Sequence, residues 1–327
     1  MSKRKKIAMA AILLVSLVSS SAFSQTELKH LQKRMEDFSD SLAKSLPFNA
    51  SIGLNWSDAY IGKFFPGVPP HLGIGASFGF TTIDMAAADH LAEALGFNIP
   101  FDTEKLMLPV YAGEIRLGGF FLPFDIGVKA GVLQPVELWG SSINTSHTLF
   151  GTEVRYALTE GGVILPKISL GVGFNYLKGG LEASVGQDVT YNIGGTNTIA
   201  IHRPDVNLFW NTLALDFKVQ VSKSLLIVTP YIGLGASYAW SEAGYEAKAQ
   251  TPINQGGNVQ DYLTANGLGD MDITGNKISS TIKVNGFSAR AFGGLSLNLA
   301  ILKLDLTGLY NFRDSNYGFS FGVRFQL

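Results

Sequence analysis

The chain has 327 residues, a formal net charge of −1 and only 16% charged residues, where soluble domains average about a quarter. A near-neutral chain without a basic stripe argues against nucleic acid as a partner. The sequence contains 37 glycines and no cysteine, which excludes disulfides, thiolate catalysis, cysteine–zinc sites and lipid attachment to an N-terminal cysteine.

Residues 1–24 have the pattern of a secretory signal. Four basic residues at positions 3–6 precede an apolar run at 7–18, and a small-x-small motif ends at Ser24. The apolar run is well short of the ~20 residues that a bilayer-spanning helix needs, so we expect cleavage near Ser24 rather than an uncleaved anchor. The sequence after it offers no transmembrane helix, so an integral membrane form would have to be a β-barrel.

Residues 26–46 show the periodicity of an amphipathic helix. Apolar residues recur three or four positions apart, charged residues cover the remaining positions, and Pro47 is expected to end the helix. An apolar stripe this narrow needs a partner surface. The simpler interpretation is a helix that packs on the periplasmic mouth of a barrel or pairs with a second copy. The alternative is a plug that enters the barrel.

From His71 onward, apolar residues alternate with small or polar ones in segments of strand length. Predicted strands cover 72–81, 109–121, 124–134, 147–158, 166–178, 205–222, 226–240, 281–298, 302–312 and 317–327. Short turns alternate with the longer connections 84–106, 135–145, 179–204 and 241–280. This predicts an all-β, antiparallel transmembrane barrel of about ten strands at 71–327, with 25–70 as a separate N-terminal segment. Twelve strands, adding 48–60 and 180–193, are the alternative.

The last strand has one fully apolar side. Its odd positions are Tyr317, Phe319, Phe321, Val323, Phe325 and Leu327, whereas its even positions are small or polar. Such a strand resembles the C-terminal strand of bacterial outer-membrane barrels, although the usual last residue of that family is aromatic. The resemblance implies that Tyr317, Phe319, Phe321, Phe325 and Leu327 form an insertion signal for the barrel-assembly machinery. It also implies contact with outer-membrane lipid in a diderm bacterium, and it places the longer connections outside the cell.

Two further features favour a membrane barrel over a soluble barrel or sandwich. The polar face is rich in glycine and serine, as suits a crowded lumen, whereas a water-facing surface would carry more Lys, Glu and Thr. Aromatic residues occur near strand ends, as in the interfacial girdles of spanning barrels. These residues are Trp139, Trp210 and Trp240 near the longer connections, and Phe120, Phe121 and Phe124 near a short turn.

Charged residues project into the predicted lumen. They are Glu114, Arg116, Asp125, Lys129, Glu153, Arg155, Asp216, Lys218, Arg290, Lys303, Asp305 and Arg324. Because buried charges must be paired or hydrated, we expect opposite charges on neighbouring strands to brace the wall. A ring of one sign, which would indicate ion selection, is not visible in the sequence.

The N-terminal segment carries an aromatic-rich stretch suited to a plug. Its candidate plug residues are Trp56, Asp58, Tyr60, Phe64 and Phe65. In architecture this resembles the hatch of fatty-acid-type outer-membrane transporters, without a binding motif that matches residue by residue. The prediction is therefore a narrow channel or transporter for small solutes, hydrophobic compounds among them. The alternative is a structural or surface-interaction barrel with a closed, salt-bridged lumen.

An enzyme is the least favoured class. The five histidines, His30, His71, His90, His147 and His202, show neither metal-site nor triad spacing, and the chain lacks an H-E-x-x-H motif and a nucleophile elbow. Its glycine pairs fall mid-strand rather than in a strand-to-helix turn, which disfavours phosphate binding. We predict no catalytic residue, no metal and no cofactor, and the sequence specifies neither a solute nor an oligomeric state.

Overall fold

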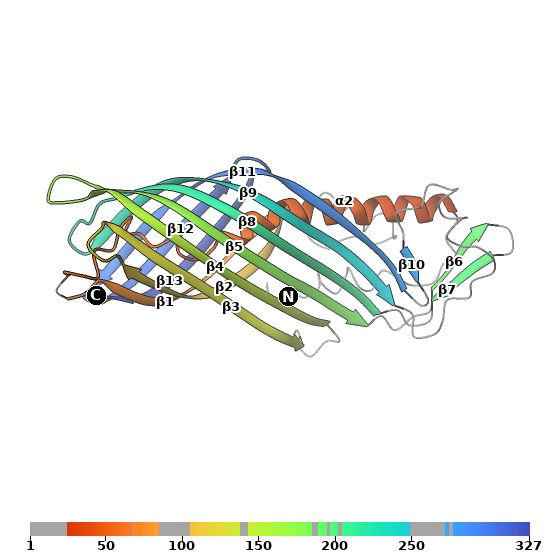
Figure 1. The fold of residues 1–327 in the computed structure, drawn as a ribbon. Coiled ribbons are helices and arrows are strands. Elements are labelled where there is room, and N and C mark those ends of the chain that lie inside the picture. Colours follow the sequence, from red (N-terminus) through yellow and green to blue (C-terminus); the bar gives the residue numbers. More distant parts are fainter. Residues whose placement is uncertain are drawn as a thin grey trace, which may run out of the picture.

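The alternating segments form a closed β-barrel that surrounds an N-terminal helix (Figure 1). The structure is a computed structural model. It describes residues 25–67, 69–84, 105–137, 143–184, 189–194, 197–201, 205–248, 272–274 and 277–327. Met85–Leu95, expected as a short helix, and Trp139, His90 and His202 lie outside the described residues.

Among the described residues, ten antiparallel strands form the barrel, which confirms the predicted count. They are β1 (Leu72–Asp84), β2 (Lys105–Gly118), β3 (Phe124–Glu137), β4 (Ile143–Glu160), β5 (Lys167–Ser184), β8 (Asp205–Ser222), β9 (Val228–Lys248), β11 (Lys277–Leu299), β12 (Leu302–Asn311) and β13 (Asn316–Gln326). The alternative of twelve strands is wrong, because β6 (Val189–Gly194) and β7 (Asn197–Ile201) form a separate hairpin and residues 48–60 are not a strand. The short β10 (Asp272–Thr274) pairs only with β11.

The barrel has two unlike ends. At the turn end, tight turns at 119–123, 161–166, 223–227 and 300–301 lie beside the start of β1 and the end of β13. At the loop end, the connections 85–104, 138–142, 185–204, 249–276 and 312–315 join the strands. Strands β5, β8, β9 and β11 run 18 to 23 residues, against 10 and 11 for β12 and β13, so one wall is taller.

The connection predicted at 241–280 is shorter in the structure, because the strands of the tall wall extend into it. Strands β9 and β11 stay paired out to Lys248 and Lys277, so the stretches 241–248 and 277–280 at its two ends are strand. Backbone pairing between two long neighbouring strands continues there although the apolar–polar alternation weakens, which is why the sequence pattern underestimated it.

The outward face of the barrel is apolar. Large apolar side chains on it are about half exposed, for example Ile74, Phe78, Ile115, Val172, Leu234 and Phe321. Period-two alternation places them all on one side of the sheet, where lipid replaces water as the contact.

The helix α2 (Gln25–Ala50) does not end at Pro47, as predicted, but continues for three residues. Leu46 and Phe48 are fully buried, and this packing outweighs the backbone hydrogen bond that proline cannot donate. Beyond the end of the helix at Ala50, the left-handed conformations of Gly53 (φ +90°) and Leu54 (φ +59°) turn the backbone aside.

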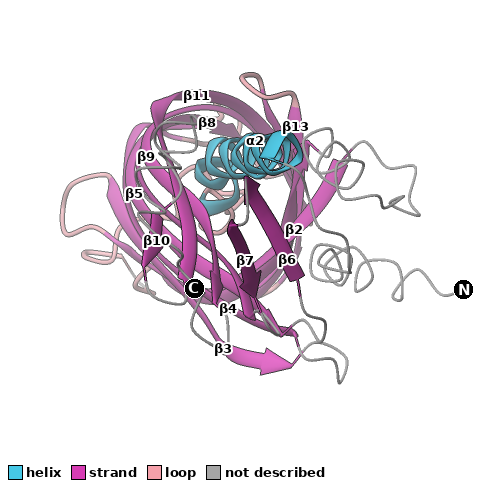
Figure 2. Ribbon diagram, turned by 90° about the vertical axis from the view of Figure 1, so that its right-hand side faces the viewer, coloured by secondary structure: helices cyan, strands magenta, loops and turns pink. Residues whose placement is uncertain are grey.

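The C-terminal half of α2 lies inside the barrel at its loop end, as the end-on view shows (Figure 2). Asn49 Nδ2 donates hydrogen bonds to Thr81 Oγ1 (2.9 Å) and Leu108 O (3.0 Å), and Asn316 Nδ2 donates to Ser45 Oγ (3.1 Å). Burial raises the pKa of Asp314 in the nearby β12–β13 turn, while the charges of Arg313 and Lys44 oppose that shift. The preferred prediction, a helix on the periplasmic mouth, is therefore wrong.

An apolar core fills the loop end of the lumen. Helix residues Phe38, Leu42 and Leu46 belong to one buried cluster with inward-facing wall residues such as Leu177, Leu208 and Tyr245. The expectation of a small or polar face along the whole lumen holds only nearer the turn end. The described helix is not long and apolar enough to cross a membrane.

Two of the three tryptophans expected in an interfacial girdle can be placed. Trp240 is outward and half-exposed, and its ring packs edge-on against Tyr238, with ring centroids 4.9 Å apart. Trp210 instead faces the lumen and is 8% exposed, so the girdle prediction is wrong for this residue. Its indole lies against Gly179, where a Cβ atom would come within 2.5 Å of Trp210 Nε1.

Truncation of the helix core should destabilise the protein. We expect Leu46→Ala to cost about 2–5 kcal/mol of unfolding free energy, because a fully buried side chain would leave a cavity. Denaturant unfolding in detergent micelles measures this. Asp37→Ala on the exposed part of the helix is the control and should change stability by less than about 0.5 kcal/mol. Equal effects for the two variants would show that the helix is not docked in the barrel.

Candidate functional site: the plugged lumen

Residues 51–62, here named the plug, continue from α2 through the lumen to the turn end. They are irregular rather than strand-like, unlike the strand at 48–60 that the twelve-strand alternative requires. Trp56, Asp58 and Tyr60 are each no more than 3% exposed. The sequence left open whether residues 25–70 lie inside the barrel, and the structure places the plug there.

The wall holds the plug mainly by its backbone carbonyls. Lys129 Nζ donates to Ala50 O (2.7 Å) at the end of the helix and to Ile52 O (2.6 Å), and Arg155 Nη1 donates to Asp58 O (2.7 Å). Further bonds run from Arg116 and Lys218 to Leu54 O, from Tyr231 to Asn55 O, from Gln220 to Trp56 O and Ser57 O, and from Lys167 to Tyr60 O. A segment without regular secondary structure thus has its buried acceptors satisfied by side chains.

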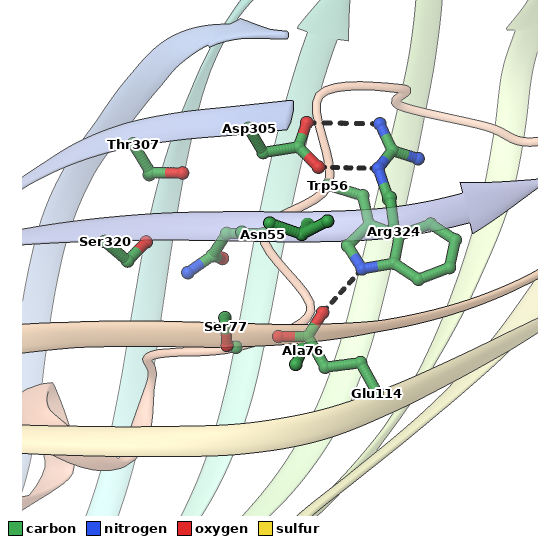
Figure 3. Close-up of a pocket in the computed structure, with 12 residues that line it drawn as sticks. Asn55, Trp56, Ala76, Ser77, Glu114, Asp305, Thr307, Ser320 and Arg324 are labelled. Atoms are coloured by element: carbon green, nitrogen blue, oxygen red, sulfur yellow. Dashed lines mark hydrogen bonds and ion pairs between the residues drawn. The ribbon is translucent and has the colours of Figure 1, made fainter. Parts of the chain in front are cut away.

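Two plug side chains add specific contacts. Asp58 Oδ2 lies 2.7 Å from Lys303 Nζ and 3.3 Å from Arg324 Nη2, and Asp58 Oδ1 lies 3.5 Å from Lys167 Nζ. The Trp56 indole donates to Glu114 Oε2 at 2.5 Å, and the Arg324 guanidinium lies 4.6 Å from the indole centroid (Figure 3). Cation–π contact and ion pairing therefore converge on the same arginine.

Behind the plug, the predicted luminal charges pair across strands. Asp125 accepts from both Arg116 (2.5 Å) and Arg155 (2.9 Å), and Glu153 pairs with Arg116 (2.8 Å) and Lys218. Separate pairs join Arg290 to Asp216 and Arg324 to Asp305, each at 2.6 Å. All twelve predicted residues face the lumen, and only Lys303 among them is more than marginally exposed.

The wall is richer in positive than in negative charge. Eight basic side chains contact the plug or a luminal acid: Arg116, Lys129, Arg155, Lys167, Lys218, Arg290, Lys303 and Arg324. Among the described residues, five buried acids belong to the wall: Glu114, Asp125, Glu153, Asp216 and Asp305. Asp58 and the carbonyl oxygens of the plug compensate the excess of basic groups.

Each luminal arginine lies across from a glycine of a neighbouring strand. The register pairs Arg116 with Gly127, Arg155 with Gly171, Arg290 with Gly235, and Arg324 with Gly75. A Cβ atom at Gly235 would come within 2.8 Å of the Arg290 guanidinium carbon. The glycine-rich luminal face therefore provides the volume that its long basic side chains occupy.

The space around the plug is small. A cavity of about 20 Å³ lies between Trp56, Glu114 and Arg324 (Figure 3), and another of about 10 Å³ lies near Lys129 and Glu153. Such volumes hold about one water molecule each, far below the several hundred Å³ of a typical ligand pocket.

Other candidate residues lie apart from the lumen. Phe64 and Phe65 are at the turn-end rim, where they pack against Phe120 and Phe121 with ring centroids 5.4 and 5.1 Å apart. Tyr317, Phe319, Phe321, Phe325 and Leu327 are all on the outward face, 42–55% exposed. Their outward position suits lipid contact, and their role as an insertion signal stays a prediction.

Lys167, Gln220 and Tyr231 were missed as site residues. Lys167 and Gln220 have the inward parity of their strands, so alternation could have identified them. Gln220 and Tyr231 are neutral donors, and only charged residues were projected into the lumen from the sequence. Among the described residues, no group of His, Asp or Glu is arranged to hold a metal ion.

Comparison with known proteins identifies the family. Residues 91–327 match the family model described as Lsa36-like. The chain belongs to the Lsa36-like family. It is an outer-membrane β-barrel protein. No curated protein matches it in sequence.

Solved structures with a similar fold are distant in sequence. The outer-membrane protease OmpT from Escherichia coli is 10% identical, with 79% of this chain and 97% of that chain covered and a TM-score of 0.42. The translocator domain of the autotransporter NalP from Neisseria meningitidis is 10% identical, with 88% and 97% covered and a TM-score of 0.37. A FadL homologue from Pseudomonas aeruginosa is 9% identical, with 83% and 96% covered and a TM-score of 0.27. At these values the likeness carries no argument about activity.

Loss of the plug carboxylate should destabilise the folded protein. We expect Asp58→Asn to cost roughly 3–5 kcal/mol, because it leaves Lys303 and Arg324 facing a neutral group in a buried site. Denaturant unfolding in micelles measures the change, with Asp37→Asn on the exposed helix surface as the matched control. Unchanged stability of Asp58→Asn would show that the plug is not held through this carboxylate.

A second prediction concerns the arginine–glycine pairs. Gly235→Val should destabilise the barrel by about 1–3 kcal/mol, because the added methyl groups overlap the Arg290 guanidinium. Gly308→Val is the control, since a Cβ atom on that outward residue would meet only Gly293 O, at 3.9 Å. The temperature at which each variant loses its heat-modifiable gel mobility ranks their stabilities. Equal temperatures for the two would contradict the steric role of Gly235.

Proposed function

We propose that this barrel is a closed scaffold that anchors the loop-end structure in the outer membrane, and that its interactions occur at that exposed face. The observation that carries the proposal is the plug, a segment of the same chain that occupies the lumen and whose backbone carbonyls accept hydrogen bonds from the wall. The short turns of outer-membrane barrels face the periplasm, so the loop end is assigned to the cell exterior.

Energetics support permanent closure. Removing the plug would leave the basic excess of the wall without Asp58 and without the carbonyl acceptors. The buried helix core adds to the cost of withdrawal, because Phe38, Leu42 and Leu46 would lose their apolar contacts.

Transport of small solutes, the function that the sequence favours, requires the plug to move. Among the described residues, the two cavities beside the plug measure about 20 and 10 Å³, which is too small for a solute. The aromatic pairs formed by Phe64 and Phe65 lie at the rim rather than along the lumen, so they line no hydrophobic route through the barrel. The proposal includes no enzymatic role, because no cluster of catalytic groups emerges among the described luminal residues.

Single-channel recording tests the proposal. We expect the full-length protein to be silent in planar bilayers, because the plug blocks the lumen. Full-length Trp56→Ala/Asp58→Asn should open intermittently, since it removes the indole and the carboxylate that contact Glu114, Arg324 and Lys303.

Deletion of residues 25–62 provides the matched open state, provided that heat-modifiable gel mobility shows that the shortened barrel has folded. Its lumen, with eight basic and five acidic wall residues, should prefer anions over cations. Steady conductance of the full-length protein would overturn the closed scaffold and restore the transport interpretation.

A further inference from the structure

Two turns at the turn end carry exposed apolar side chains. The turn between β4 and β5 contains Val163, Ile164 and Leu165, and the turn between β8 and β9 contains Leu225, Leu226 and Ile227. All six side chains are more than half exposed, and those of Val163 and Leu226 are 98% and 99% exposed. Figure 1 shows both turns projecting from the left-hand end of the barrel. These six residues are here named the turn patch.

Lys223 joins the two turns. Its Nζ atom donates hydrogen bonds to the carbonyl oxygens of Gly162 (2.8 Å), Val163 (2.7 Å) and Leu165 (3.1 Å). Gly162 N also donates to Leu165 O at 3.1 Å. The two turns therefore present one apolar surface, and surfaces of this kind mark interaction sites. Three carbonyls of the first turn have partners inside the protein, as backbone groups in contact with lipid require.

The backbone of Leu226 points to a role for its side chain. Its φ is +52°, in the left-handed region that glycine, asparagine and aspartate adopt more readily than leucine does. The side chain is fully exposed, so packing within the protein does not offset the strain. An apolar residue retained at such a position is accounted for by a contact outside the protein.

The turn patch continues the lipid-facing surface of the wall. The outward residues of β8 and β9 next to the second turn are Val219, Val221, Val228 and Pro230. All four are apolar, so the apolar surface runs from the wall onto the turn without interruption along these two strands. Beside the first turn, Glu160 is paired with Lys63 at 3.1 Å.

The height of the wall places the turn patch at the edge of the bilayer. On β9 the outward apolar residues run from Val228 to Trp240, and the next outward residue is Glu242. This stretch of 12 residues corresponds to roughly 30 Å of barrel height, at 3.4 Å per residue and a strand tilt of about 40°. The hydrocarbon core of a bilayer is ~30 Å thick. With Trp240 at its outer boundary, the turn that follows β8 lies at its periplasmic boundary.

We propose that the turn patch inserts into the acyl chains of the periplasmic leaflet of the outer membrane and holds the turn end at a fixed depth. Its continuity with the lipid-facing wall and its height relative to Trp240 identify phospholipid as the occupant. The inference goes beyond the closed scaffold and does not depend on whether the lumen conducts.

Single-cysteine variants that carry a nitroxide test lipid contact, and the absence of native cysteine gives a clean background. Leu226→Cys and Ile164→Cys probe the turn patch. Ile232→Cys on the outward face of β9 is the lipid reference, and Lys33→Cys on the exposed part of α2 is the water reference. The full-length protein is reconstituted in vesicles of phosphatidylethanolamine and phosphatidylglycerol. Collisions of each nitroxide with oxygen and with a water-soluble nickel chelate are then measured.

We expect the ratio of oxygen to nickel collisions at Leu226→Cys and Ile164→Cys to be several-fold higher than at Lys33→Cys and comparable to that at Ile232→Cys. Oxygen concentrates among acyl chains, whereas the chelate stays in water. Ratios equal to that of Lys33→Cys would overturn the proposal and leave the turn patch facing water, where a periplasmic protein would be its partner. Heat-modifiable gel mobility shows that each variant has folded before it is measured.

A second experiment tests whether the turn patch sets the depth of the barrel. The double substitution Leu226→Asn/Ile164→Asn is made in the Ile232→Cys background, since asparagine suits the left-handed turn position and removes the apolar tips. We expect the oxygen-to-nickel ratio at Ile232→Cys to fall, because the turn end moves toward water. An unchanged ratio in a folded barrel would overturn the anchoring role.

These results separate the two proposals. A barrel that conducts while its turn-patch nitroxides contact lipid would end the closed scaffold and leave the insertion of the turns standing. A silent barrel whose turn-patch nitroxides face water would end the insertion and leave the scaffold standing.

Discussion

The structure depends on how positive charge is compensated inside the barrel. Arg116 and Arg155 share Asp125, and other nitrogens of the two guanidinium groups reach Glu153 and carbonyls of the plug. The wall and the plug are thus electrostatically incomplete without each other, because the strands carry more basic than acidic groups. Burial of a charged group is tolerated only when its donors are met, so the plug is part of the folded core rather than an accessory to it.

The same requirement explains the composition of the strands. A lumen this narrow cannot hold a row of bulky residues beside four arginines, and glycines opposite Arg116, Arg155, Arg290 and Arg324 provide the missing volume. Nearer the loop end Leu208, Trp210 and Tyr245 line the lumen, and there the buried apolar side of α2 replaces the charged plug. The interior therefore changes along the barrel axis, from ion pairs nearer the turn end to apolar packing at the loop end.

Alternation along the chain predicted much of this, because the direction of a strand side chain is a local property. It identified the ten strands and the inward position of residues such as Arg116 and Asp125. It misplaced Trp210, because the inner face at the loop end is apolar only where a helix fills it, and a strand carries no sign of that partner. The apolar stripe on 26–46 indicated a partner surface but not which end of the barrel provides it. The helix was expected to end at Pro47, but the burial of Leu46 and Phe48 stabilises its continuation.

Closure of the ring has a consequence for the order of assembly. Strands β1 and β13 are the first and last of the barrel, and they pair over nine residues, from Gly73 with Gln326 to Thr81 with Gly318. Once this seam has formed, residues 25–62 can move only lengthwise, through a lumen whose charges they themselves compensate. The earliest-synthesised part of the barrel's interior is thus enclosed by the last-synthesised strand. In the finished molecule, residues 25–62 pass through a closed ring formed by the strands of the same chain. The pairing of β1 with β13 and the covalent link to β1 keep this segment in the lumen.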